Sequence, residues 1–126
     1  MSFSNFLETE ILDHVFAGAA YSAPGTHYLG LFTSAPGETG GGTELSGSAY
    51  VRKSVAFTTS GNTTSNNAAI EFPTATGNWG TVTHVGVFDA STSGNLMAYA
   101  TLSASKTIET GDVFRVPSGD LDITLN

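Results

Sequence analysis

The residues that could carry acid–base or metal chemistry are few and scattered. The three histidines, His14, His27 and His84, have no second histidine or carboxylate at the spacing of a His-x-His or His-Glu-x-x-His motif. Asp13 precedes His14 on a predicted helix, where adjacent side chains point to different sides, so the two do not form a dyad. The chain has no cysteine, which excludes disulfides and thiolate metal sites. The sequence therefore predicts no metal site.

Serine, glycine and aspartate patterns give no catalytic arrangement either. No serine lies in a Gly-x-Ser-x-Gly motif, and the glycines at 40–42 are not followed by the Gly-Lys-Ser/Thr of a phosphate-binding loop. Asp120 and Asp122 share one face of a predicted strand, which is typical of a solvated face. Asp89 precedes a Ser-Thr-Ser-Gly-Asn turn, where capping of the turn is favoured over calcium binding. We therefore predict that the protein is not an enzyme and needs no cofactor.

Aromatic residues are the remaining candidates for a ligand site. They could form a stacking platform for sugars, although in a chain of this size they are expected mainly in the core or in an interface. The residues in question are Tyr21, Tyr28, Tyr50, Trp79 and Tyr99.

Composition narrows the possible partners. The 126 residues are 40% hydrophobic and 12% charged, as expected of one folded domain, residues 1–126. Four basic residues stand against eleven acidic ones, for a net charge of −7. So few cations predict no nucleic-acid partner and no anionic membrane surface. No apolar run reaches the roughly 18 residues of a membrane span, and the start lacks the basic region of a secretory signal. We expect a soluble protein that is made in the cytosol.

One amphipathic helix is predicted over residues 4–17. Phe3, Leu7, Ile11 and Val15 recur every four residues, and Ser4 or Asn5 can cap the start. The same stripe is broadened by Phe6, Leu12 and Phe16. The apolar stripe is wide, so it packs either on the body of the domain or on a neighbouring subunit.

About eight short strands are predicted in residues 27–126, separated by turns, and they indicate a mainly antiparallel β-sandwich of jelly-roll or immunoglobulin type. The central strand is expected at residues 79–89, because both of its faces carry apolar residues. Other strands are expected at residues 49–59 and 96–102, and a short edge strand at 105–109. Gly80 and Gly86 in this strand indicate a bulge or a close backbone approach. Residues 34–48 form a long glycine-rich loop, and residues 60–67 a second exposed loop.

The chain resembles small proteins of tailed bacteriophages that are labelled tail-fibre or minor structural proteins. The strongest match is Phe72-Pro73 followed by Trp79-Gly80-Thr81-Val82-Thr83-His84-Val85-Gly86-Val87-Phe88-Asp89-Ala90. Others are Ser4-Asn5-Phe6-Leu7-Glu8, His27-Tyr28-Leu29-Gly30-Leu31-Phe32 and Ser48-Ala49-Tyr50-Val51-Arg52, where Val51 replaces the alanine of a Tyr-Ala-Arg pattern. The resemblance implies a virion protein.

Two virion roles and one enzymatic role are compatible with this resemblance. Tail fibres are usually long and repetitive, whereas this chain is short and has no heptads, which favours a capsid decoration or cement protein that stabilises the head shell. The alternative is a tail-fibre or baseplate-associated protein that binds a host glycan. An enzyme acting on surface polysaccharide is disfavoured, because no nucleophile or carboxylate arrangement is present.

The predicted partners are further copies of the chain, as a dimer or trimer, and the major capsid protein or other virion proteins. The helix stripe and the loop from Pro36 to Ser48 are the predicted contacts of a capsid protein, and exposed aromatics are those of a receptor binder. The candidate interface residues are Phe3, Phe6, Leu7, Pro36, Glu44, Tyr50 and Trp79.

Overall fold

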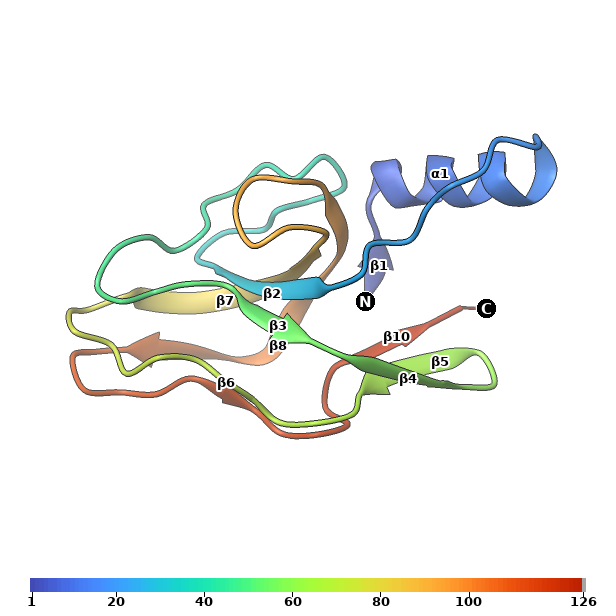
Figure 1. Ribbon diagram of the computed structural model, residues 1–126. Coiled ribbons are helices and arrows are strands. Elements are labelled where there is room, and N and C mark those ends of the chain that lie inside the picture. Colours follow the sequence, from blue (N-terminus) through green and yellow to red (C-terminus); the bar gives the residue numbers. More distant parts are fainter. Residues whose placement is uncertain (126) are drawn as a thin grey trace.

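The computed structural model describes residues 1–125, so Asn126, the last residue of the predicted domain, lies outside the described residues. One helix and ten strands are found in the described part (Figure 1). In chain order they are β1 (Ser2–Phe3), α1 (Asn5–Phe16), β2 (His27–Phe32), β3 (Lys53–Val55), β4 (Phe57–Ser60), β5 (Thr63–Asn66), β6 (Ile70–Glu71), β7 (Gly80–Phe88), β8 (Leu96–Ile108), β9 (Arg115–Val116) and β10 (Asp122–Thr124).

The main sheet has five strands in the order β1-β8-β7-β2-β3, and all of its pairings are antiparallel. The predicted central strand is confirmed as β7, which lies between β8 and β2. Gly86 pairs in register with Gly30 of β2. A Cβ atom at Gly86 would lie 2.7 Å from Leu96 Cδ1 and 3.1 Å from Phe32 Cε1, so only glycine leaves room for these side chains. The register between β7 and β8 shifts near Val82.

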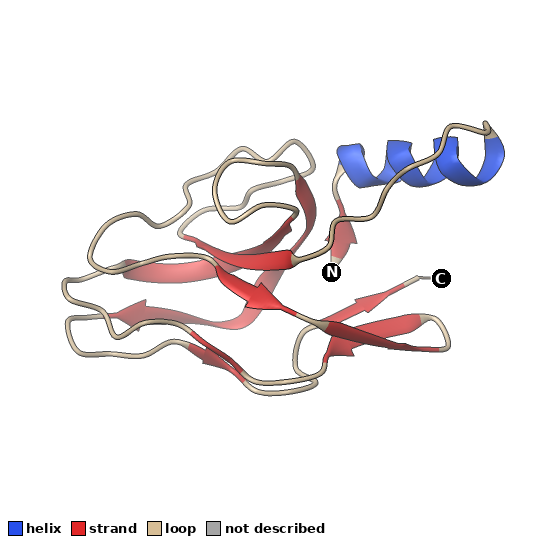
Figure 2. Cartoon of the chain, in the orientation of Figure 1, coloured by secondary structure: helices blue, strands red, loops and turns tan. Residues whose placement is uncertain are grey.

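Two smaller sheets form the second layer, as the strand arrangement in Figure 2 shows: β10-β5-β4 and β6-β9. One core joins the layers, because apolar residues of the main sheet and of β6 belong to the same buried cluster, and the partly buried Phe57 of β4 and Ile123 of β10 pack against it. Its members include Leu29, Leu31, Val85 and Val87 from the main sheet, Ile70 from β6, and Phe72, Phe114 and Leu121 from the segments beside the small sheets. The mainly β, antiparallel fold with one helix is confirmed.

The strand boundaries differ from the prediction in three places. The strand expected at residues 49–59 is divided into β3 and β4. The strands expected at 96–102 and 105–109 are one continuous strand, β8. The loop predicted at 60–67 contains β5, whose hydroxyls bond across the sheet: Thr59 to Thr64 at 3.0 Å and Thr63 to Thr124 at 2.9 Å. These polar pairs hold a strand that its composition alone disfavours.

The helix begins where the sequence predicts. Ser4 is the N-cap, and its Oγ accepts a hydrogen bond from the Leu7 amide (3.2 Å). The same hydroxyl donates to the Leu96 carbonyl of β8 (2.5 Å), and the Ser4 amide donates to Met97 (2.8 Å). Leu7 is the buried residue of α1. The helix is therefore fixed to the body by its first turn, and Figure 1 shows the rest of it running away from the main sheet, in the direction in which the β4–β5 hairpin also projects.

Candidate functional site

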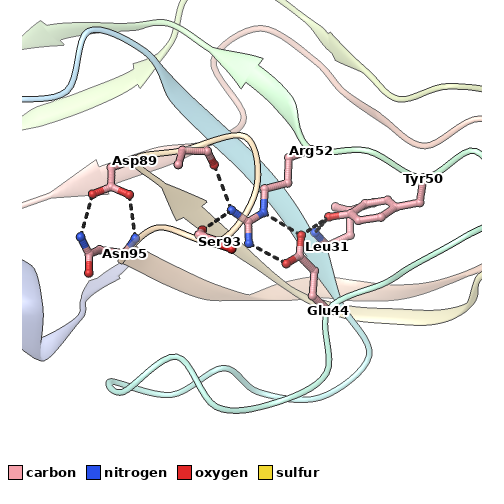
Figure 3. Close-up of polar contacts among 8 residues, drawn as sticks. Leu31, Glu44, Tyr50, Arg52, Asp89, Ser93 and Asn95 are labelled. Atoms are coloured by element: carbon pink, nitrogen blue, oxygen red, sulfur yellow. Dashed lines mark hydrogen bonds and ion pairs between the residues drawn. The ribbon is translucent and has the colours of Figure 1, made fainter.

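The most highly organised polar cluster lies where the long loop after β2 meets the loop between β7 and β8 (Figure 3). At its centre is the Arg52 guanidinium, which binds both Glu44 carboxylate oxygens at 2.8 Å. Its Nη1 donates to the carbonyls of Ala90 (2.9 Å) and Ser93 (2.8 Å). The guanidinium also stacks on the Phe88 ring, 3.5 Å from the ring centroid. Arg52 thus joins two loops that are about forty residues apart in sequence to the main sheet.

Tyr50 also belongs to this cluster. Its hydroxyl donates to Glu44 Oε2 (2.6 Å) and accepts a hydrogen bond from the Leu31 amide of β2 (3.0 Å). Burial, and then the hydrogen bond to Glu44, raise the pKa of Tyr50 above its ordinary value. Glycine at position 30 makes the close approach possible, since a Cβ atom there would lie 2.9 Å from Glu44 Oε2 and 3.0 Å from the Phe88 ring.

The loop between β7 and β8 is also held by its own side chains. The Asp89 carboxylate accepts hydrogen bonds from the Asn95 amide (2.6 Å) and the Asn95 side chain (2.9 Å). This confirms the predicted side-chain-capped turn. Ser93 has a φ of 53°, an unusual conformation for a residue other than glycine, and its carbonyl is one of the two that Arg52 holds.

A second strained turn lies in the long loop. Ser48 and Ala49 have φ values of 52° and 72°. The Trp79 indole donates to the Ser48 carbonyl (2.8 Å), and the Trp79 ring meets the Tyr50 ring edge-on at 5.5 Å. Such conformations persist where the surrounding contacts over-determine them, often at functional sites.

Between the two loops lies a hollow of about 300 Å³, which we call the loop hollow. It is lined mainly by polar and small groups: Glu44, Leu45, Ser46, Gly47, Tyr50, Val51, Arg52, Ser91, Thr92 and Ser93. The charges of Arg52 and Glu44 are paired with each other, at side-chain exposures of 8% and 24%. What the hollow offers a ligand is therefore the exposed apolar side chain of Val51 together with hydroxyl and backbone groups.

The predicted interface residues have separate locations. Leu7, Pro36 and Trp79 are buried inside the chain, so their side chains are not available on the surface of this structure. Trp79 in particular presents no exposed face on which a sugar could stack. Phe3 and Phe6 are half-buried at the base of the helix, and Phe6 packs edge-on against Tyr21. Glu44 and Tyr50 are brought together in the Arg52 cluster.

The sequence did not predict which apolar side chains of the helix are exposed. Leu12, Val15 and Phe16 of α1 are 57%, 59% and 81% exposed, and we call them the helix tip. The sequence placed them in the apolar stripe without showing which part of the stripe the body covers. Their spacing of three and four residues puts them on one side of the helix.

The histidines have local roles. His14 Nδ1 accepts the Tyr21 amide (3.0 Å), His27 packs edge-on against Phe57, and His84 Nδ1 lies 2.7 Å from the Thr83 hydroxyl. Burial lowers the pKa of His27. In the described residues, no group of three or more histidine, aspartate or glutamate side chains is placed to hold a metal ion. Among those residues, too, no helix has the length and apolar character to cross a membrane.

These features define a small antiparallel β-sandwich module. Hydrogen bonds and an ion pair join the loops at one end of it, and a helix projects from it. The chain belongs to the family described as "Podophage GP4 fiber I protein gp80", whose model matches residues 2–124. None of the curated proteins compared with the chain matches it. The family confirms the resemblance to bacteriophage tail-fibre and structural proteins, so the chain is a structural component of a virion. It supports the tail fibre rather than the capsid decoration role that the short, repeat-free chain had favoured.

Proposed function

We propose that the chain is a non-catalytic module of a phage tail fibre and that its loop hollow contacts a glycan on the host surface. The observation that carries the fibre assignment is the family match, which spans residues 2–124. A capsid decoration role has no comparable support.

The loop hollow is the best-prepared surface for recognition. Its walls are fixed by the four hydrogen bonds of Arg52 and by the Asp89–Asn95 turn, so little conformational freedom is lost on binding. Serine and threonine hydroxyls at positions 46 and 91–93 supply donors and acceptors that suit a sugar. The net charge of −7 disfavours a strongly anionic ligand. We therefore propose a neutral or weakly charged saccharide.

Location in the virion is tested by copy number. Quantitative mass spectrometry of purified virions, calibrated against the major capsid protein, should find a small number of copies of the chain, in the range of a tail appendage. Antibody labelling in electron micrographs should then mark the tail. A copy number close to that of the capsid protein, or labelling of the head, would return the chain to the capsid decoration role.

Recognition is tested with the purified full-length chain and a variant that fills the hollow. Ser91 is exposed and lines the hollow, whereas Ser60 is equally exposed on β4, outside it. We expect the wild-type chain to compete with phage adsorption and Ser91→Trp to weaken this competition at least about tenfold, as removal of a binding hot spot does. Ser60→Trp is the matched control and should compete like the wild type. If the wild-type chain does not bind host cells or glycans, or if both variants bind equally, the loop hollow is not the recognition site.

A further inference from the structure

The hydroxyl groups that line the loop hollow are free to bind a ligand. Four exposed residues carry them: Ser46, Ser91, Thr92 and Ser93. Within residues 1–125 the hydrogen bond found for these four residues runs from Arg52 to the Ser93 carbonyl, so their hydroxyls have no partner there. Hydroxyls of the β10-β5-β4 sheet differ, because they bond to one another, as Thr63 and Thr124 do at 2.9 Å. The hollow therefore keeps donors and acceptors that the rest of the surface uses internally.

The charged groups beside these hydroxyls are already bound. The Arg52 guanidinium binds both oxygens of the Glu44 carboxylate, and the Tyr50 hydroxyl donates to Oε2 of the same carboxylate. The Nη1 atom of Arg52 is held by the carbonyls of Ala90 and Ser93. The hollow therefore meets a ligand with neutral hydrogen-bonding groups.

Val51 supplies the apolar part of the hollow. Its side chain is 53% exposed, whereas that of Leu45, the other aliphatic residue of the lining, is 8% exposed. The Tyr50 ring is stacked on Phe72 (6.2 Å) and meets Trp79 edge-on (5.5 Å), so its faces are occupied within the chain. Stacking of a sugar ring on an aromatic face is therefore not offered here. The apolar contact on offer is a pair of valine methyl groups, an area that suits another methyl group.

The size of the loop hollow limits the ligand further. Its volume of about 300 Å³ lies at the lower end of the range for small-molecule sites, roughly 300–1,000 Å³. A hollow of this size suits a single sugar unit, such as the end of a glycan chain, rather than a long oligosaccharide.

We propose that the sugar unit bound in the loop hollow carries a methyl group, which packs on Val51 while the free serine and threonine hydroxyls bind the hydroxyls of the sugar. This inference rests on the proposed function, because it names the class of saccharide that the same site takes. Two kinds of neutral sugar share the required chemistry: a 6-deoxyhexose has a methyl group at C6, and an N-acetylhexosamine has one in its acetamido group. A hydroxyl group placed against Val51 would lose hydrogen bonds to water without replacement. Val51 is thus the residue that determines specificity.

The first test compares sugars with and without the methyl group. Binding of the full chain to host cells is competed with L-rhamnose and L-fucose, and with L-mannose and L-galactose, which have a hydroxymethyl group at C6 instead. N-acetyl-D-glucosamine and N-acetyl-D-galactosamine are compared with D-glucose and D-galactose. We expect a methyl-bearing sugar to compete at a concentration about tenfold lower than its parent sugar, as one apolar group in a binding site implies. The pair that differs identifies the source of the methyl group.

The second test changes the proposed contact on the protein. Val51→Thr replaces one methyl group by a hydroxyl and keeps the shape of the side chain. We expect the ratio between the inhibitory concentrations of the parent and the methyl-bearing sugar to fall from about ten to about one, as loss of the apolar contact implies. A general disturbance of the hollow would weaken both sugars and leave this ratio unchanged. The matched control is Val15→Thr, since Val15 is 59% exposed and lies on the helix tip, and it should keep the ratio of the wild type. Urea denaturation should show both variants as stable as the wild type within about 0.5 kcal/mol.

The outcomes separate this inference from the proposed function. A chain that binds neither host cells nor glycans overturns both. A chain that binds host cells, but is inhibited equally by the methyl-bearing and the parent sugars or by no methyl-bearing sugar, overturns the methyl contact and leaves glycan binding standing. A preference for the methyl-bearing sugar that persists in Val51→Thr removes Val51 from the contact and overturns the inference in the same way.

Discussion

Two regions of this protein are held in place differently. One is the loop end, where the loop between β2 and β3 meets the loop between β7 and β8, and the other is the helix arm, residues 2–16. At the loop end, Arg52 makes four hydrogen bonds and stacks on Phe88, so loops distant in sequence are fixed to the sheet. In the arm, Ser4 and Leu7 fix the first turn of the helix, and the remaining turns, about two, carry exposed apolar side chains. The first region satisfies its polar groups internally, whereas the second leaves apolar side chains exposed.

The difference separates residues that matter for stability from residues that the fold of the single chain does not need. Removal of a side chain at the loop end should unfold local structure, because buried charges lose their partners. Removal of a side chain at the helix tip should leave the single chain intact and change only what it contacts. Three substitutions test this contrast, in decreasing order of expected effect.

The largest effect is expected for Arg52→Ala. It leaves the partly buried Glu44 carboxylate and the carbonyls of Ala90 and Ser93 without their donor. Loss of one partner of such a pair costs about 3 kcal/mol of unfolding free energy. Urea denaturation at concentrations where the chain is monomeric measures it. Arg115→Ala is the control, since Arg115 is exposed and has no ion pair in the described residues, and it should change stability by less than about 0.5 kcal/mol. If both substitutions lower the free energy of unfolding by the same amount, the contacts of Arg52 do not stabilise the loop end in the way described.

A smaller effect is expected for Ser4→Ala, at the one place where the arm is fixed. The substitution removes the cap of α1 and leaves the Leu96 carbonyl without its donor. We expect a loss of about 1 to 2 kcal/mol, typical of an N-cap substitution. Hydrogen exchange should show faster opening at the start of α1 and around Leu96, and unchanged protection at the loop end. If Ser4→Ala lowers the hydrogen-exchange protection of amides throughout the molecule, the helix arm and the loop end do not open independently, which contradicts the difference between them.

The smallest effect is expected for Tyr50→Phe, and it depends on pH. The pKa of Tyr50 is raised in the folded chain, first by burial and then by the hydrogen bond to Glu44. An unfolded tyrosine loses its proton near pH 10. Above that pH the unfolded chain loses a proton that the folded chain keeps, so the stabilisation present below pH 10 is lost as pH rises. Tyr50→Phe should be about 1 kcal/mol less stable at pH 8, and its stability should fall less steeply than that of the wild type between about pH 9 and 11. If the stabilities of the wild type and of Tyr50→Phe fall equally steeply with pH, the Tyr50 hydroxyl is not held in the way described.

Local patterns in the sequence were sufficient for much of the fold. The four-residue spacing from Phe3 to Val15 and the cap at Ser4 predicted α1 to within a residue at each end. The apolar residues on both faces of residues 79–89 predicted the central strand. The composition of residues 60–67 predicted a loop, and this was wrong, because β5 is held by cross-strand hydroxyls and by Asn66, whose side chain binds Ala68, Pro117 and Leu121. These partners lie up to 55 residues away and leave no local pattern.

The candidate site was less accessible from the sequence for the same reason. Glu44 and Tyr50 were predicted as interface residues, but Arg52, which organises them, was not. Its contacts with Ala90 and Ser93 are 38 and 41 residues distant in sequence. An arginine beside a tyrosine and near a glutamate has no distinctive spacing, so the cluster becomes visible only when β2 and β7 are paired.

The hydrogen bond from Ser4 to Leu96 joins residues that are 92 positions apart in sequence, and this separation affects when the arm can fold during synthesis. The arm is therefore synthesised about ninety residues before its docking site on β8. Until then the apolar residue Leu7 of α1 has no β8 against which to pack. Because contacts this distant in sequence form slowly, we expect the arm to be among the last parts of the domain to fold.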